Sequence, residues 1–123
     1  MKRLKVLSIL IVEDDTDLRE LMSEDFAGYS TQIGTADSGL QALEKISEKK
    51  YDIIICDMYM PKGDGRFLAQ ELLKIDGVKP LLFLYSGIND FSGEEKKALN
   101  IAEIFTKPCK TTDMVNMILK HLN

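Results

Sequence analysis

Histidine and cysteine are scarce in this sequence, and their scarcity narrows the kinds of site that it can build. The 123 residues include one histidine, His121, and two cysteines, Cys56 and Cys109. The cysteines have neither the spacing of metal ligands nor a histidine near them, so they indicate reduced, structural thiols. His121 stands near the end of an amphipathic segment. There we expect a solvated side chain close to the negative end of a helix dipole, not a catalytic base.

The sequence also lacks long apolar runs and any concentration of positive charge. Its longest apolar stretch falls far short of the roughly 18 residues that a membrane span needs. The first residues, MKRLKVLSIL, contain no small-residue cleavage site of a secretory signal. The formal net charge is -4 and the lysines are scattered, which argues against a nucleic-acid surface. We therefore expect a cytoplasmic protein that binds neither membranes nor nucleic acid.

The residues that are present have the proportions of an ordinary soluble globular protein. Hydrophobic residues make up 45% of the chain and charged residues 29%, close to the averages for such proteins. A chain of 123 residues is long enough to bury a full core without disulfides or metals. We predict that residues 1–123 form one domain.

Apolar runs and amphipathic segments alternate along the whole chain. Strands are predicted at residues 5–12, 31–36, 51–56, 80–85 and 103–105. Helices are predicted between and after them: Asp15 or Thr16 can cap the first, and Ser38 with Gln41 forms a capping box for the second. Residues 90–100 have few apolar positions and give the weakest helix. The unbroken alternation predicts an α/β fold, a single doubly wound (βα)5 sandwich with right-handed crossovers.

Polar residues stand at the carboxyl ends of four of the predicted strands. They are Glu13 with Asp14, Asp57, Ser86 and Lys107. Ligands of doubly wound sheets bind outside the carboxyl ends of the strands, where the strand order reverses. Carboxylates beyond buried strands are costly unless a cation or a reaction uses them. Each residue alone has an ordinary explanation as a cap, a turn or a solvated charge. The set predicts a magnesium site, a carboxylate nucleophile and two groups that can hold a phosphoryl oxygen.

These motifs, in this order, resemble the receiver (CheY-like) domain of two-component response regulators over nearly the whole chain. They are the acidic pair in IVEDD, the run DIIICDMYMPKGDG with Pro61 and Gly65, the Ser-Gly pair at 86–87, and Lys107-Pro108. The resemblance implies a flavodoxin-like parallel sheet of five strands in the order 2-1-3-4-5 and a cis peptide bond before the last proline. In that order the two cysteines would lie too far apart for a disulfide.

The same resemblance implies a phosphorelay site. Asp57 would accept a phosphoryl group from a sensor histidine kinase or a histidine phosphotransfer protein. Mg²⁺ would be required because the carboxylate and the phosphoryl group are both negative. Its ligands would be Asp14, Asp57 and the backbone carbonyl of Tyr59, with Glu13 through water. The protein would be a signalling phosphoacceptor and not an enzyme, catalysing only its own phosphorylation and dephosphorylation.

Lys107 and Ser86 would each bind a phosphoryl oxygen in this mechanism. Ser86 would also belong to the switch region, which changes the surface that a downstream protein or a fused effector recognises. Many members place a Tyr or Phe three residues before the lysine as the other half of the switch, where this sequence has Ile104. Phe105 is adjacent, but strand alternation directs it to the other face. Cys109 is a second departure, in place of a common Phe after Lys-Pro.

Two further side chains are predicted to control how long the phosphoryl group lasts. Tyr59 follows Asp57 by two residues, and Ile88 follows Ser86 by two. Hydrolysis needs a water in line with an Asp57 oxygen, and a phenol and a branched hydrocarbon can crowd that water. We expect slow loss of phosphate. The alternative is that both side chains point into loop contacts and matter little.

Other classes of function fit the sequence less well. A phosphatase of the haloacid dehalogenase type needs a second Asp two residues after its nucleophile, where this chain has Tyr59. A flavodoxin-like carrier has no use for three carboxylates around an anionic cofactor, and the glycine-rich lysine loop of P-loop hydrolases is missing. The alternative that stays open is a pseudo-receiver, an interaction module that works without phosphorylation. The receiver would either act alone or form part of a longer regulator or hybrid kinase.

Overall fold

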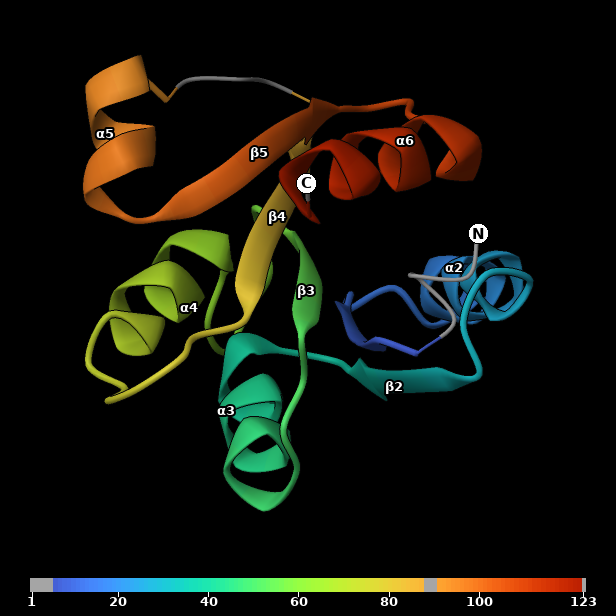
Figure 1. Cartoon of the computed structure of the whole chain (residues 1–123), viewed down its shortest axis with the longest axis horizontal. Helices are drawn as coiled ribbons and strands as arrows, with labels where there is room; N and C mark the ends of the chain where they lie inside the picture. The colour runs from blue at the N-terminus through green and yellow to red at the C-terminus, as the bar shows by residue number, and fades with distance from the viewer. Residues whose placement is uncertain (1–5, 88–90, 123) are drawn as a thin grey trace.

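The protein is a parallel sheet between two layers of helices (Figure 1). The computed structural model describes residues 6–87 and 91–122. Within those residues the strands are β1 (Ser8–Val12), β2 (Gln32–Ala36), β3 (Ile53–Asp57), β4 (Leu81–Ser86) and β5 (Ile101–Thr106). The helices there are α2 (Thr16–Ala27), α3 (Gly39–Glu48), α4 (Gly65–Leu72), α5 (Gly93–Ala98) and α6 (Thr111–Leu122). None of these helices is long and apolar enough to span a lipid bilayer.

The five strands pair in parallel in the order β2-β1-β3-β4-β5, which confirms the predicted fold class and strand order. From β1 the chain adds β2 on one side and then crosses to add β3 on the other. The strand order therefore reverses between β1 and β3. A crevice for a ligand is expected at the carboxyl ends of these two strands.

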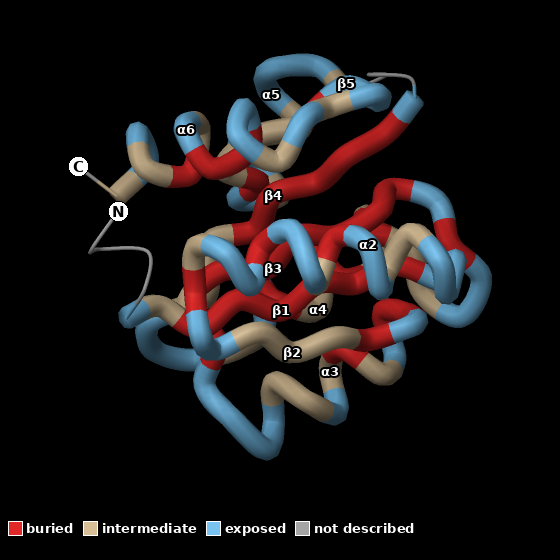
Figure 2. Tube along the Cα trace, turned by 90° about the vertical axis from the view of Figure 1, so that its right-hand side faces the viewer, coloured by how far each residue is buried: buried red, intermediate tan, exposed pale blue. Residues whose placement is uncertain are grey.

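Successive side chains of the central strands point alternately into two cores. On β1, Leu10 and Val12 belong to the core covered by α3 and α4, whereas Ile9 and Ile11 belong to the core covered by α2 and α6. Figure 2 shows β1, β3 and β4 buried along nearly their whole length, with exposed residues gathered on the helices and loops. Continuous apolar strands of this kind are what a parallel sheet covered on both faces requires.

Side-chain caps start the first two helices where the sequence predicts. Asp15 accepts hydrogen bonds from the backbone N–H groups of Asp17 (3.0 Å) and Leu18 (3.2 Å) at the start of α2. Ser38 accepts one from the N–H of Gln41 at 3.1 Å and begins α3. These bonds satisfy N–H groups that have no partner inside the helix. The cap of α2 also fixes the direction in which the chain leaves the carboxyl end of β1.

The observed boundaries differ from the predicted ones mainly around β5. The sequence predicts a strand over residues 103–105, but β5 extends from Ile101 to Thr106, and its register on β4 shifts between Leu82 and Phe83. The helix predicted within residues 90–100 is only Gly93–Ala98 and buries none of its own residues. Asn100 adopts a left-handed backbone with φ of 56°, a conformation that ends a helix, so the chain enters β5 directly after it.

Candidate functional site

Three carboxylates meet at the point where the strand order reverses, and we call Glu13, Asp14 and Asp57 the acidic cluster. Each offers a carboxylate oxygen, and these oxygens all lie within 4.8 Å of one another. Pairing of β1 with β3 places Val12 opposite Cys56. Glu13 and Asp57, which follow these two residues, therefore lie side by side. Glu13 and Asp57 are buried whereas Asp14 is exposed. An all-oxygen donor set of this kind fits Mg²⁺.

Glu13 is held by a protein donor at each of its two oxygens. Its Oε1 accepts a hydrogen bond from the Tyr85 hydroxyl at 2.7 Å, and its Oε2 accepts one from the Asp15 backbone N–H at 3.0 Å. Burial raises the pKa of Glu13 from 4.5 to about 6; the nearby carboxylates of Asp14 and Asp57 act in the same direction, and the two hydrogen bonds oppose them. The carboxylate is therefore fixed in orientation, and a nearby cation would relieve the cost of its charge.

The side chain of Lys107 turns back from the end of β5 toward Asp57. Its Nζ lies 3.3 Å from Oδ2 of Asp57 and 5.0 Å from the centre of the Tyr85 ring. Its backbone N–H donates to the carbonyl of Ser86 at 2.7 Å, which ties the loop after β5 to the end of β4. The Lys107–Pro108 peptide bond is cis, as the family resemblance implies. Asp57 therefore has the other two carboxylates of the acidic cluster and the Lys107 ammonium group as neighbours.

The loop after β3 folds back over the phosphoacceptor candidate. The backbone N–H of Tyr59 donates to Oδ1 of Asp57 at 3.4 Å, and that of Gly65 donates to the Met58 carbonyl at 2.9 Å. A Cβ at Gly65 would lie 3.1 Å from the Asp57 carbonyl oxygen and 2.9 Å from a methyl of Leu84. Only glycine allows this close approach, so Gly65 lets α4 begin directly against the end of β3. Tyr59 as a whole is 56% exposed.

Ser86 is the last residue of β4, and only 1% of it is exposed. It lies next to β5, with Thr106 as its register partner, on the same edge of the sheet as Asp57 and Lys107. All five residues that the sequence predicts for the site therefore follow or end strands on this edge. Ile88, predicted to affect the lifetime of the phosphoryl group, lies outside the described residues.

The two residues considered for the aromatic half of the switch lie on opposite faces of β5. Ile104 packs against the core covered by α3 and α4. Phe105 is buried on the other face, stacked on Phe83 with the ring centres 5.7 Å apart. The alternation predicted for these two residues is confirmed, so Phe105 does not stand in for the aromatic residue that Ile104 replaces. A switch role for Ser86 and Ile104 stays a prediction.

The cysteines and the histidine lie where the sequence indicates. Cys56 and Cys109 are both free of a disulfide, and burial raises the pKa of each thiol above its ordinary value. His121 is exposed in the last turn of α6, with its Nε2 3.5 Å from an oxygen of Glu103. None of the three contributes to the acidic cluster.

Sequence reasoning misses two side chains that touch the site. The pattern places Tyr85 only in a buried strand, yet its hydroxyl bonds Glu13. The sequence does hold a signal for this contact, because the hydroxyl of a buried tyrosine needs a hydrogen-bond partner. Tyr85 is paired with Asp57 in the register of β3 and β4. Arg19 donates from Nη1 to the carbonyl oxygen of Glu13 at 2.8 Å and so braces the loop after β1. Its position one turn into α2 gives no distinct signal.

Comparison with known proteins identifies this arrangement. The family model described as the response regulator receiver domain matches residues 9–119. The chain belongs to the response regulator receiver family. Receivers are signalling phosphoacceptors that bind Mg²⁺ at an acidic pocket, and this chain has an acidic group made of Glu13, Asp14 and Asp57. The resemblance drawn from the sequence motifs is confirmed.

Two relatives have about the same length as this chain. The chain is 28% identical over 114 residues to the response regulator receiver protein CpdR of Brucella abortus, covering 93% of this chain and 95% of that protein. It is 30% identical over 115 residues to sporulation initiation phosphotransferase F of Bacillus subtilis, covering 93% and 92%. Several other relatives are longer transcription regulators, of which the chain spans only about a fifth.

A solved receiver domain shows the same fold. The CheY-like response regulator receiver domain of Methylobacillus flagellatus superposes with a TM-score of 0.82, covering 95% of this chain and 98% of that one, at 24% sequence identity. At this sequence identity the structural similarity establishes the fold alone, and the chemistry has to be argued from the side chains of the site.

Proposed function

We propose that this receiver accepts a phosphoryl group on Asp57 with Mg²⁺ held by the acidic cluster, and that phosphorylation switches a surface that binds another protein. The position of the Asp57 carboxylate carries the proposal. It is buried, lies within the acidic cluster and also has the Lys107 ammonium 3.3 Å away. A carboxylate placed between a cation site and a fixed ammonium has the groups that an incoming phosphoryl group requires.

The phosphodonor is a phosphohistidine of a sensor histidine kinase or a histidine phosphotransfer protein. An oxygen of Asp57 attacks phosphorus, forming the O–P bond of an acyl phosphate, while the N–P bond breaks and its electron pair returns to the imidazole. Asp14 and Asp57, with the Tyr59 carbonyl, would hold the Mg²⁺ ion. Glu13 acts through water, in keeping with the two protein donors already on its oxygens. Bound Mg²⁺ supplies positive charge that offsets the repulsion between carboxylate and phosphoryl group.

Lys107 and Ser86 receive the phosphoryl oxygens. Lys107 exchanges its contact with Asp57 for one with a phosphoryl oxygen, and the Ser86 hydroxyl donates to another. Ser86 is buried at the end of β4, so its movement would be passed to the β4–α5 side of the molecule, where Ile104 packs.

We also propose a cytoplasmic location. The net charge of -4 supports a protein partner for this domain and not nucleic acid.

Wild-type protein incubated with acetyl phosphate and Mg²⁺ should gain one phosphoryl group by intact mass spectrometry. The label should be lost in hydroxylamine, because an acyl phosphate is cleaved there and a phosphoserine is not. Chelation of Mg²⁺ before the donor is added should prevent labelling. Absence of any label at saturating Mg²⁺ would contradict the proposal and favour the pseudo-receiver.

Spontaneous loss of the phosphoryl group should be slow and should depend on Tyr59 and Ile88. The backbone N–H of Tyr59 donates to Oδ1 of Asp57, so Tyr59 lies next to the carboxylate in the folded chain. A Tyr59→Asn, Ile88→Glu variant should lose phosphate several-fold faster, because its polar groups can orient the water. Decay is followed after removal of the donor at saturating Mg²⁺. Equal rates of phosphate loss in the two proteins would refute the idea that Tyr59 and Ile88 shield the acyl phosphate from water, and would leave the receiver assignment unchanged.

A further inference from the structure

Tyr85 contacts both charged parts of the site. Its hydroxyl donates to Oε1 of Glu13 at 2.7 Å, and its ring lies beneath the Lys107 ammonium, 5.0 Å from Nζ to the ring centre. The residue is 2% exposed. Its carbonyl accepts the Met58 N–H at 3.0 Å, and Asp57 is its register partner on β3. Tyr85 is therefore anchored by the sheet while its side chain reaches across to the carboxyl end of β1.

The hydrogen bond between Tyr85 and Glu13 fixes a carboxylate that has few other supports. Glu13 is 1% exposed and has two protein donors, one on each oxygen. The donor on Oε2 is the backbone N–H of Asp15, a contact that does not depend on any side chain. The Tyr85 hydroxyl is thus the side-chain contact that sets where Oε1 points. Burial raises the pKa of Tyr85 far above its ordinary value, so the hydroxyl stays protonated and keeps donating.

We propose that Tyr85 is a positioning residue that sets the affinity of the receiver for Mg²⁺ by orienting Glu13. The inference rests on the metal site of the proposed function. Partners that orient groups around a metal typically contribute a factor of about ten or more to metal affinity. Tyr85→Phe removes the donor, and Glu13 can then rotate away from the other two carboxylates. The ring and its contact with Lys107 remain in that variant.

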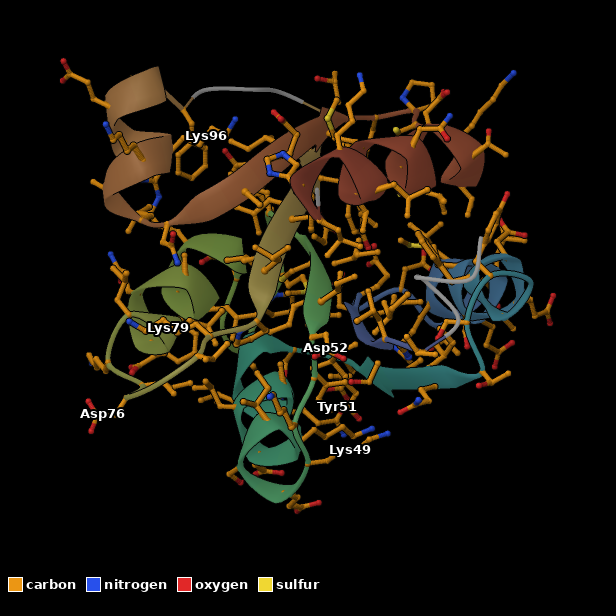
Figure 3. The ribbon with its side chains drawn as sticks, in the orientation of Figure 1. Lys49, Tyr51, Asp52, Asp76, Lys79 and Lys96 are labelled. Carbon is orange, nitrogen blue, oxygen red and sulfur yellow. The ribbon has the colours of Figure 1, made fainter. Side chains whose placement is uncertain are left out.

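The test measures metal binding without any phosphodonor. Free Mn²⁺, which takes the same oxygen ligands as Mg²⁺, is titrated by electron paramagnetic resonance and then displaced with Mg²⁺. Tyr85→Phe should weaken both ions about tenfold relative to wild type. Tyr51→Phe is the matched control. Tyr51 is also buried, but it lies just before β3, near the amino ends of the strands and beside Lys49 (Figure 3). The metal affinity of the Tyr51→Phe variant should equal that of wild type.

A double-mutant cycle with Glu13 separates orientation from a general effect on the fold. In a Glu13→Ala background, Tyr85→Phe should change Mn²⁺ affinity by less than about twofold, since the carboxylate that it orients is absent. Such non-additivity is expected only for residues that act through one contact. Wild-type affinity in Tyr85→Phe, or the same tenfold loss with and without Glu13, would overturn the proposal. Urea unfolding of each variant checks that the fold is retained.

Labelling by acetyl phosphate distinguishes this inference from the proposed function. In Tyr85→Phe the half-saturating Mg²⁺ concentration should rise about tenfold, and the change should lie there and not in the maximal labelling rate. A fall in the maximal rate with unchanged half-saturation would contradict a positioning role. If wild type binds the ions as expected but is never labelled, the proposed function fails and the role of Tyr85 stands. If wild type binds neither ion, both fail.

Discussion

Asp57→Asn protein should gain no phosphoryl group from acetyl phosphate at any Mg²⁺ concentration. An amide oxygen is a poor nucleophile, and the substitution also removes a charge from the acidic cluster, so both attack and metal binding are lost. Intact mass spectrometry should give only the unmodified mass, with labelling at background. This is the largest single effect expected in the chain, because Glu13 is held at both oxygens and Asp14, although it belongs to the acidic cluster, is exposed and not buried as Asp57 is.

Asp76→Asn is the control for this substitution. Asp76 is an exposed acid in the loop before β4, away from the carboxyl ends of the strands (Figure 3), and its loss changes the net charge equally. This variant should be labelled as fast as wild type. A label that persists in Asp57→Asn, or that survives hydroxylamine, would show that another residue is the acceptor.

The fold and most of the site follow from patterns that the sequence displays directly. Continuous apolar runs such as IIIC in β3 identify strands buried on both faces, and parallel strands bring their carboxyl ends to one edge. Glu13, Asp57 and Lys107 meet there because each lies just where its own run ends. The strand order comes from the family resemblance, since periodicity alone does not distinguish one order of parallel strands from another.

Contacts made across strands are harder to predict. Tyr85 appears in the sequence as one more apolar residue of LLFLY, and its bond to Glu13 depends on the register of β1, β3 and β4 and on the length of a phenol. The limits of β5 depend on its register shift with β4. The helix α5 has six residues and none of them is buried, so its position is set by capping from Ser92 and by pairs such as Lys96 with Glu103, not by an apolar stripe.

Replacing Glu13 by Gln and Asp14 by Asn together should abolish Mg²⁺-dependent labelling and make the metal-free protein more stable. Only Asp57 would remain as a charged ligand, which is too little for a divalent cation that competes with its own hydration. The fold should survive because glutamine has nearly the shape of glutamate, and its side-chain amide can still bond the Tyr85 hydroxyl, which accepts as well as donates. Labelling by acetyl phosphate across a Mg²⁺ series measures the first effect.

The gain in stability has a defined sign and pH range. Burial raises the pKa of Glu13 from 4.5 to about 6, so between these pH values the native state binds the proton more tightly than the unfolded chain. Stability of the wild type therefore falls as the pH rises from about 4.5 to about 6 and stays lower above that, by roughly 2 kcal/mol for this one group. The double variant lacks this cost, so its advantage in urea unfolding should be full at pH 7 and vanish below about pH 4.5.

A Glu20→Gln, Glu24→Gln double variant separates this effect from a change in net charge. Both of these acids are exposed on α2, so their replacement removes the same two charges without relieving buried repulsion. Its urea midpoint at pH 7 should stay close to that of wild type, since exposed charges contribute little. Addition of Mg²⁺ should raise the midpoint of wild type and of this control but not of the site variant, because a ligand that binds only the native state stabilises it. A site variant less stable than wild type in metal-free buffer would mean that the acids at the end of β1 maintain the fold and do not serve a cation.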